Sequence, residues 1–254
     1  EHRQPSSAYL VGRNIQNYRL RAEHTHPCRT HKMASSNSNS MLADAMNYLS
    51  FLLGLIENQN WMKLEDVVDL NPKIFKVISK TISDREEFNG MTLLHAFVRY
   101  DPPINVLNKM IKLYPQALKE KDCLGRTPLH VAAGSGASPW VIKILTMNYP
   151  QACNVQDEDG RTPLHFACDT SCELFEDDQD LPRGPRSLDI DTIRIILTGS
   201  LAAATLEDVD DMNAYDYAIV SDAPIEVVNL LQKAMNHSPR TLCPTSVMAT
   251  IRAH

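Results

Sequence analysis

The sequence lacks a long apolar run, an excess of positive charge and a regular pairing of cysteines. The longest apolar candidate, Tyr48–Ile56, is too short to cross a bilayer and is followed by Glu57. The 25 Lys and Arg residues are scattered and outnumbered by 31 Asp and Glu, which gives a net charge of −6. We therefore expect no membrane insertion and no nucleic-acid partner, because nucleic acid is bound chiefly through clustered positive charge.

A secretory signal is also lacking, since residues 1–32 are polar and rich in His and Arg. Without such a signal, the six cysteines predict reduced thiols in an intracellular protein, cytoplasmic or nuclear. Residues 1–40 have no apolar period and are predicted to form a disordered arm. Met33 opens a Ser- and Asn-rich run that resembles a natural start, so residues 1–32 are expected to precede that start or to belong to the arm.

The strongest pattern in the sequence is a 35-residue repeat. Asn-Gly-Met-Thr-Leu-Leu-His-Ala at 89–96 returns as Leu-Gly-Arg-Thr-Pro-Leu-His-Val at 124–131 and as Asp-Gly-Arg-Thr-Pro-Leu-His-Phe at 159–166. Tyr-Pro-Gln-Ala at 114–117 returns at 149–152 with the same period. Two blocks that share one period and one phase indicate a repeat architecture.

The repeated residues suit a tight turn that leads into a helix. Gly125 stands where such a turn needs a positive φ, and Thr127 precedes proline, which favours the extended backbone of an N-cap. Pro128 at the first helical position loses no hydrogen bond, Leu129 is expected to point into the stack, and His130 is expected to bind the turn and Thr127. The corresponding residues form the structural set Gly90, Thr92, His95, Gly125, Thr127, Pro128, Leu129, His130, Gly160, Thr162, Pro163, Leu164 and His165.

This pattern, Gly-x-Thr-Pro-Leu-His-x-Ala, resembles the ankyrin repeat, and the resemblance covers about Met41–Asn236. It implies an all-α solenoid in which each repeat contributes a β-hairpin or turn, an inner helix, an outer helix and a return loop. We divide the chain into the arm at 1–40, an ankyrin-repeat domain at 41–236 and a flexible tail at 237–254. Within the domain we expect a capping repeat at 41–88, repeats at 89–123, 124–158 and 159–209, and a terminal repeat at 210–236.

The terminal repeat aligns with the preceding one only after a shift of 51 residues, which places Asn213 on Thr162. The 16 residues beyond the usual period fall at about 172–188, an acidic and Pro-rich run that we predict to be a solvated loop outside the core. Helical spacing before the first clear turn predicts helices near 46–56, 60–71 and 74–82. The last outer helix is predicted over Pro224–Met235, with Ile225, Val228 and Leu231 facing inward.

The resemblance also implies that the concave face, made of hairpin tips and inner helices, binds another protein through positions outside the repeat pattern. Tyr and Arg are the expected anchors, whereas the convex outer helices are expected to contribute little. Packing between adjacent hairpins is an alternative role for Phe88 and Leu124. The candidates are Phe88, Met91, Leu124, Arg126, Glu158, Arg161 and Asp210 at hairpin tips, and Arg99, Tyr100, Ser135, Asp169 and Thr170 on inner helices.

The sequence gives little support for a metal site or a catalytic site. The histidines of successive repeats would stand about 10 Å apart, too far to share one zinc ion. His24, His26, Cys28 and His31 form a metal-like cluster, but in a segment without a supporting core. The acidic run lacks the ligand spacing of a calcium loop. We expect no catalytic residue, no cofactor and no metal.

The sequence therefore predicts a protein–protein interaction scaffold or adaptor that is monomeric on its own. A regulatory or inhibitory subunit of an enzyme complex would use the same surface and stays open as an alternative. An enzyme with an unrecognised site is the less favoured alternative, since no phosphate-binding loop or nucleophile elbow is present.

Overall fold

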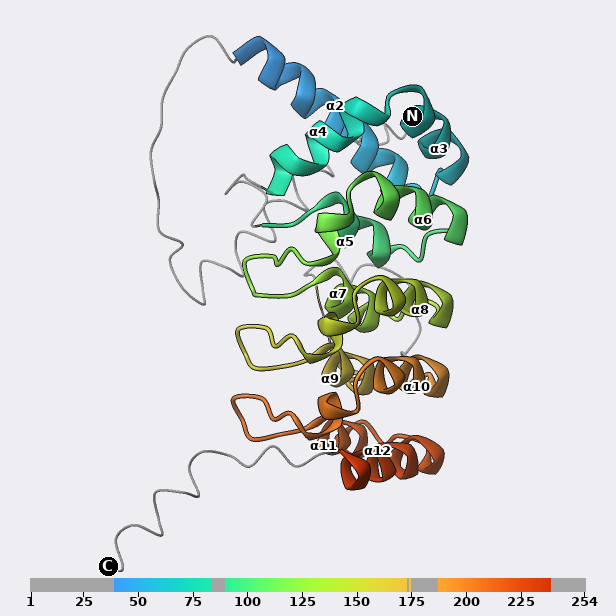
Figure 1. Cartoon of the computed structure of the whole chain (residues 1–254), viewed down its shortest axis with the longest axis vertical. Helices are drawn as coiled ribbons and strands as arrows, with labels where there is room; N and C mark the ends of the chain where they lie inside the picture. The colour runs from blue at the N-terminus through green and yellow to red at the C-terminus, as the bar shows by residue number, and fades with distance from the viewer. Residues whose placement is uncertain (1–38, 84–89, 173, 175–186, 239–254) are drawn as a thin grey trace, which may run out of the picture.

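The computed structural model of the chain describes residues 39–83, 90–172, 174 and 187–238. These residues form an elongated stack of helix pairs, with long hairpin loops that project from one side of the stack (Figure 1). Within the described ranges the hairpins contain no extended strands, and an isolated antiparallel bridge joins Glu207 to Asn213. The predicted all-α solenoid with turns between its repeats is therefore confirmed.

Three helices open the stack, at the places where the apolar spacing predicted them: α2 (Asn39–Glu57), α3 (Trp61–Leu70) and α4 (Pro72–Ser83). Helix α2 buries Leu52 and Ile56, four residues apart on one face. The side chain of Asn60 caps α3 by accepting a hydrogen bond from the backbone N–H of Lys63. Helix α2 packs against α5, and α4 packs against α6, so the three helices close one end of the stack.

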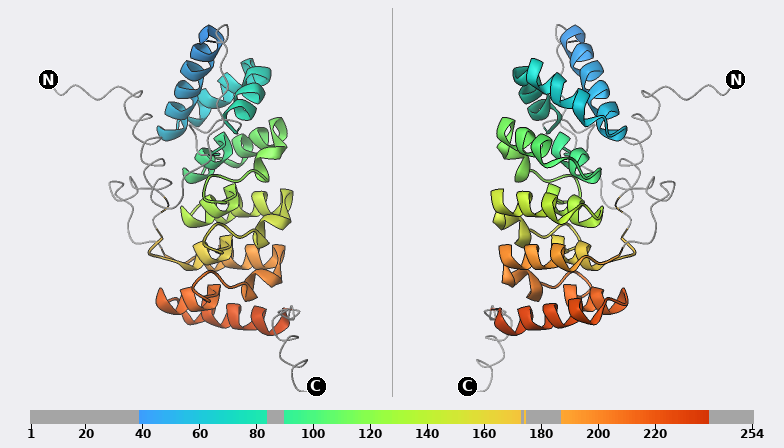
Figure 2. Two further views of the ribbon diagram at one scale, coloured as in Figure 1. Left: turned by 90° about the vertical axis from the view of Figure 1, so that its left-hand side faces the viewer. Right: turned by 90° about the vertical axis from the view of Figure 1, so that its right-hand side faces the viewer.

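Four helix pairs follow, each consisting of a short inner helix and a longer outer helix (Figure 2). A 3-10 turn follows each of the first three outer helices, near the tight Tyr-Pro or Ser-Leu step. The inner helices are α5 (Leu93–Arg99), α7 (Pro128–Gly134), α9 (Pro163–Cys168) and α11 (Ala214–Val220); the outer helices are α6 (Ile104–Leu113), α8 (Pro139–Asn148), α10 (Ile190–Gly199) and α12 (Ile225–His237); the 3-10 turns are η2 (Pro115–Leu118), η3 (Pro150–Asn154) and η5 (Leu201–Thr205).

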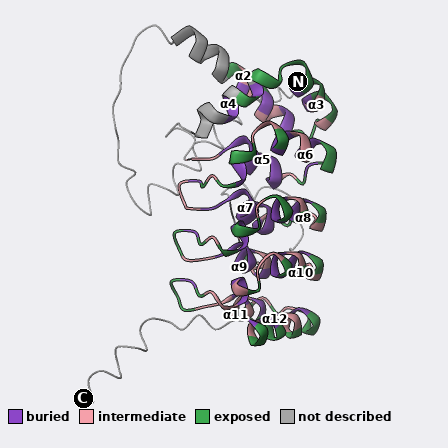
Figure 3. Ribbon diagram, viewed as in Figure 1, coloured by how far each residue is buried: buried purple, intermediate pink, exposed green. Residues whose placement is uncertain are grey.

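The core runs along the whole stack between the inner and outer helices. Every residue of α7 is buried, whereas the outer helices alternate buried and exposed positions as amphipathic helices do. Figure 3 shows the buried residues as a continuous column over the inner helices, with exposed residues on the outer helices and hairpin tips. Two opposite faces are therefore available to other molecules, the hairpin side and the outer-helix side.

Helix α12 differs from the prediction in which residues it buries. Ile225, expected to face inward, is exposed, and Val228 is half-buried. The buried residues are Val227, Leu231 and Ala234, at spacings of four and three. The helix begins at Ile225 itself, so this side chain lies in the first turn at the edge of the stack, and the inward face starts two residues later. The prediction was correct for Leu231 and wrong for Ile225.

The run predicted to lie outside the core contributes one side chain to it. Leu174 is only 2% exposed, and its Cδ1 would lie 2.7 Å from a Cβ added to Gly134 of α7. The carbonyl of Leu174 accepts a hydrogen bond of 3.4 Å from Nη1 of Arg126. The chain that leaves α9 thus folds back over the inner helix of the preceding pair, where the absence of a side chain at Gly134 leaves room for Leu174. Phe175 and residues 176–186 lie outside the described residues.

Candidate protein-binding surface

Three hairpins of the same design form the hairpin side, and we call them the second (122–127), third (157–162) and fourth (208–213) hairpins. Each begins with an aspartate whose Oδ1 accepts hydrogen bonds from the backbone N–H groups two and four residues later. These bonds are 2.8–3.1 Å long and fix the loop from within. The residues are Asp122, Asp157 and Asp208, and sequence reasoning missed them although they recur at the same offsets of 35 and 51.

The turn residue of each hairpin has a positive φ, as the sequence predicted for the glycines. Gly90, Gly125 and Gly160 have φ values of 71°, 75° and 78°. In the fourth hairpin the equivalent residue is Asp211, with a φ of 59°. The fold therefore keeps the left-handed turn even where glycine is absent, and aspartate is among the residues that tolerate it.

The three histidines tie each helix to the next hairpin along the stack. In His95, His130 and His165, Nδ1 accepts a hydrogen bond of 2.9–3.1 Å from the backbone N–H of the Thr three residues earlier. Nε2 must then carry the proton, and it donates to a backbone carbonyl of the following hairpin, that of Arg126, Arg161 or Met212. The predicted bond to Thr is confirmed. The bond to the next hairpin was not predicted and makes each histidine a link between neighbouring units.

Burial keeps these imidazoles neutral. It lowers the pKa of all three histidines, and that of His130 to about 3. Both ring nitrogens are already used in hydrogen bonds, so these residues act as structural links. Within the described part of the chain, no group of three or more His, Cys, Asp or Glu side chains is arranged to hold a metal ion. The cluster His24, His26, Cys28 and His31 lies outside that part.

A pocket of about 420 Å³ lies on the hairpin side, between the second and third hairpins, helix α9 and Leu174. Its wall combines apolar side chains, among them Phe166, with charged ones of both signs. Five of the residues predicted to contact a partner line this one pocket: Leu124, Arg126, Glu158, Arg161 and Asp169.

The two arginines of the pocket differ in their exposure. Arg126 is only 2% exposed, and its guanidinium pairs with the carboxylate of Asp122 at 2.8 Å. Arg161 is partly exposed, pairs with Asp159 at 2.9 Å, and stacks on the ring of Phe166 at 4.7 Å from the centroid. Arg161 is thus held in place with one side open to the pocket, whereas Arg126 forms part of the floor.

The other predicted residues lie at several depths along the same side. Arg99, predicted as an exposed anchor, is buried beside the ring of Tyr100, and Arg126 is likewise buried, so neither side chain is offered to a partner in this conformation. The backbone carbonyl of Leu174, 48 residues away in the sequence, accepts a hydrogen bond from Arg126, a contact that the repeat pattern could not reveal. Met91, Tyr100, Ser135 and Thr170 are half-buried, Asp210 is exposed, and Phe88 lies outside the described residues.

The fold, the hairpins and the histidine links together define a helical repeat solenoid of paired helices. Residues 110–167 match the family model described as ankyrin repeats (many copies), so the chain contains ankyrin repeats. No curated protein matches the chain. Ankyrin repeats generally mediate protein–protein interaction and are typically not enzymatic. None of the described helices combines the length and the apolar character needed to cross a membrane.

Proposed function

We propose that this chain is an interaction scaffold that binds a partner protein at the pocket between the second and third hairpins. The observation that carries the proposal is that this pocket gathers five residues which sequence analysis selected because they lie outside the repeat pattern. Four of them, Leu124, Glu158, Arg161 and Asp169, keep some surface open to solvent. A volume of about 420 Å³ also lies within the range of ligand-binding pockets, about 300–1,000 Å³.

The pocket has the mixed character that protein recognition uses. Arg161 is stacked on Phe166 and fixed by Asp157 and Asp159, so little conformational freedom remains for it to lose on binding. Arginine is also enriched among the residues that dominate binding energies. Around it, Glu158, Asp159 and Asp169 supply carboxylates at the pocket wall. A partner that inserts an apolar side chain and places a basic group at the wall fits this arrangement best.

Co-purification with tagged variants of the full chain tests the proposal. Glu158→Lys changes an exposed carboxylate at the pocket, and Arg161→Ala removes the stacked guanidinium. We expect both to reduce recovery of the partner bound by the wild type, and a true anchor costs about 1–4 kcal/mol when truncated. Lys112→Glu on α6 and Lys233→Glu on α12 are matched charge changes at exposed outer-helix positions and should leave recovery unchanged.

The reverse pattern, loss with the two outer-helix variants and retention with the two pocket variants, would contradict the proposal. Thermal unfolding of all four variants controls for stability, because Arg161 also pairs with Asp157 inside the third hairpin. If the partner is an enzyme, its activity with and without this chain separates a scaffold from a regulatory subunit.

A further inference from the structure

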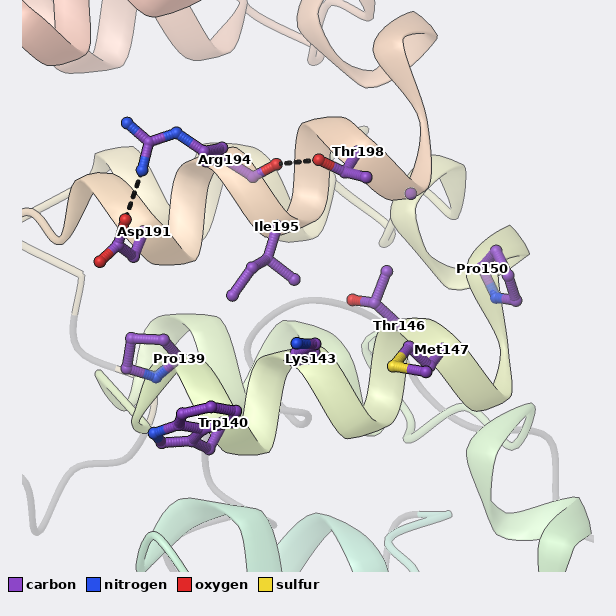
Figure 4. Close-up of a pocket in the computed structure, with 11 residues that line it drawn as sticks. Pro139, Trp140, Lys143, Thr146, Met147, Pro150, Asp191, Arg194, Ile195 and Thr198 are labelled. Atoms are coloured by element: carbon purple, nitrogen blue, oxygen red, sulfur yellow. Dashed lines mark hydrogen bonds and ion pairs between the residues drawn. The ribbon is translucent and has the colours of Figure 1, made fainter.

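The outer-helix side carries a second and larger pocket, an elongated groove of about 800 Å³ between α8 and α10. Figure 4 shows the two helices side by side, with Ile195 of α10 and Thr146 of α8 directed into the space between them. Pro139, Trp140, Lys143 and Met147 line the groove on the α8 side. This side had been expected to be convex and solvated, with little to offer a partner.

Two large apolar side chains at this groove are exposed, Trp140 by 60% and Met147 by 70%. They occupy the second and ninth positions of their helix. The other outer helices have polar residues at both positions: Asn105 and Lys112 in α6, Asp191 and Thr198 in α10, Glu226 and Lys233 in α12. The stack itself therefore does not require Trp and Met there, and exposed apolar groups of this size that line one groove indicate a surface that another molecule covers.

The charge of the groove selects among possible occupants. Asp191 and Arg194 pair with each other within α10. Lys143 lies 5.3 Å from the ring centroid of Trp140 and forms no ion pair among the described residues. Lys143 is therefore the unneutralised charge in the lining of the groove, which makes the groove positive and apolar on a chain whose net charge is −6.

The groove also has the length of a short helix. Helices α8 and α10 each have ten residues, or about 15 Å at a rise of 1.5 Å per residue. Gly199 brings the end of α10 close to α8, since an added Cβ would lie 2.5 Å from Cγ2 of Thr146. Two parallel helices with apolar residues between them form the kind of groove that receives a third, amphipathic helix.

We propose that the groove between α8 and α10 is a docking site for an acidic amphipathic helix of a partner protein. Apolar side chains spaced three or four residues apart cover Trp140, Met147 and Ile195, and an Asp or Glu on the same helix faces Lys143. This site is separate from the pocket at the second and third hairpins, and it gives the scaffold a second point of attachment on its opposite side.

Selection of random 16-residue peptides, displayed on phage, against the immobilised full chain tests the proposal. Selected peptides are then synthesised, and their affinities are measured for the wild type and for Trp140→Ala and Lys143→Glu. We expect acidic peptides with apolar residues at helical spacing. Trp140→Ala should weaken them at least tenfold. Lys143→Glu should weaken them several-fold at low salt and less at high salt.

Matched controls come from the equivalent positions of α6. Asn105→Ala and Lys112→Glu repeat the two kinds of change outside the groove and should leave affinity unchanged. In a Trp61→Phe background, Trp140 is the remaining tryptophan, so its emission should shift to shorter wavelength when the peptide covers it. Met147→Ala provides a second apolar test if Trp140→Ala fails to fold.

Three results would overturn this proposal. The first is recovery of no binding peptide, or of peptides without acidic residues. The second is a set of peptides that ignore Trp140→Ala but respond to Glu158→Lys, which would support the hairpin pocket instead. The third is a self-association of the chain, measured by sedimentation, that Trp140→Ala abolishes, because a second copy would then occupy the groove.

Discussion

The third and fourth hairpins reach the same conformation with different residues. The third uses Gly160 at the turn, with Thr162 and His165 as the capping box, whereas the fourth uses Asp211 at the turn with Asn213 and Asp216. In both, the side chain at the third helical position accepts a hydrogen bond from the backbone N–H of the capping residue, at 2.9 and 3.0 Å. Either set of residues therefore shapes the turn and starts the helix.

The difference lies in the bond to the neighbouring unit. His165 has an Nε2–H that donates to the carbonyl of Met212, whereas a carboxylate at Asp216 has no hydrogen to donate. No further hairpin follows the fourth one within the described residues, so no such donor is required there. The comparison assigns two roles to the histidine, capping its own helix and coupling to the next hairpin, and only the first role to Asp216.

The largest expected effect comes from removing the residue with both roles. His130→Ala should destabilise the chain by about 3–5 kcal/mol, because it leaves a cavity and buried polar groups without partners. Asp216→Ala removes only a cap and should cost about 1 kcal/mol. Urea unfolding at pH 7 measures both. Similar losses for the two variants would show that the bond from His130 to the next hairpin contributes nothing measurable.

The second prediction compares the inner helices α7 and α11. Gly134 of α7 lies under Leu174, while the equivalent residue of α11, Val220, is 77% exposed. Leu174→Ala should therefore cost about 2–3 kcal/mol, toward the lower end for buried leucines because the site borders a loop. Val220→Ala removes a similar apolar group from an exposed position and should change stability by less than about 0.5 kcal/mol.

The same two variants can decide whether Leu174 belongs to the core. If Leu174→Ala leaves the free energy of unfolding as little changed as Val220→Ala does, the segment after α9 does not pack on α7 in solution. The original expectation of a wholly solvated loop would then be restored.

Most of the fold could be predicted because its determinants are local and periodic. Positive φ at Gly125, the Thr127–His130 cap and Pro128 at the first helical position all follow from residues within six positions of one another. The hydrogen bond from Arg126 to the carbonyl of Leu174 could not be predicted, because Leu174 lies 48 residues away in the sequence. A repeat pattern shows which positions are equivalent, but not which of them an insertion covers.

The candidate sites also separate into one that the repeat pattern predicts and one that it does not. Five predicted residues converge on the hairpin pocket, since the repeat period fixes which positions lie side by side. The groove at Trp140 was missed because the outer helices were treated as one uniform solvated face. Comparing Trp140 with Asn105, Asp191 and Glu226 at the equivalent position would have marked it as different from sequence alone.

The third prediction is that the histidine-linked hairpins make stability dependent on pH. Burial lowers the pKa of His130 to about 3, so below pH 6.5 the unfolded chain takes up a proton that the folded chain does not. Stability must then fall as the pH decreases, by about 2 kcal/mol for His130 between pH 7 and pH 5. Burial lowers the pKa of His95 and His165 as well, and both act in the same direction.

One group in the third hairpin opposes this trend. Burial raises the pKa of Asp157 to about 6, so below pH 6 the folded chain takes up a proton first and gains some stability. Unfolding at pH 7 and pH 5 should still show a net loss in the wild type. His130→Gln keeps an acceptor for the Thr127 N–H and should show a smaller loss between the two pH values. Asp216→Asn, which removes no imidazole, should retain the full loss, and an equal pH dependence for the wild type and His130→Gln would exclude His130 as a source.

The smallest expected effect concerns the turn residue itself. Gly125→Ala should cost about 1–2 kcal/mol, because its φ of 75° is unfavourable for a residue with a Cβ. The added Cβ would also lie 3.2 Å from the backbone N of Glu158 in the third hairpin. Asp211 already has a Cβ at a φ of 59°, and no described hairpin stacks beyond it, so Asp211→Ala should cost less than about 1 kcal/mol. Gly125→Ala introduces both a Cβ at positive φ and crowding against the third hairpin, whereas Asp211→Ala introduces neither, so urea unfolding of both variants at pH 7 measures the combined cost of strain and crowding. Equal losses would mean that neither the positive φ of Gly125 nor the close approach of the third hairpin penalises a side chain there, and that the stack is held by its helices and histidine links rather than by close contact between turns.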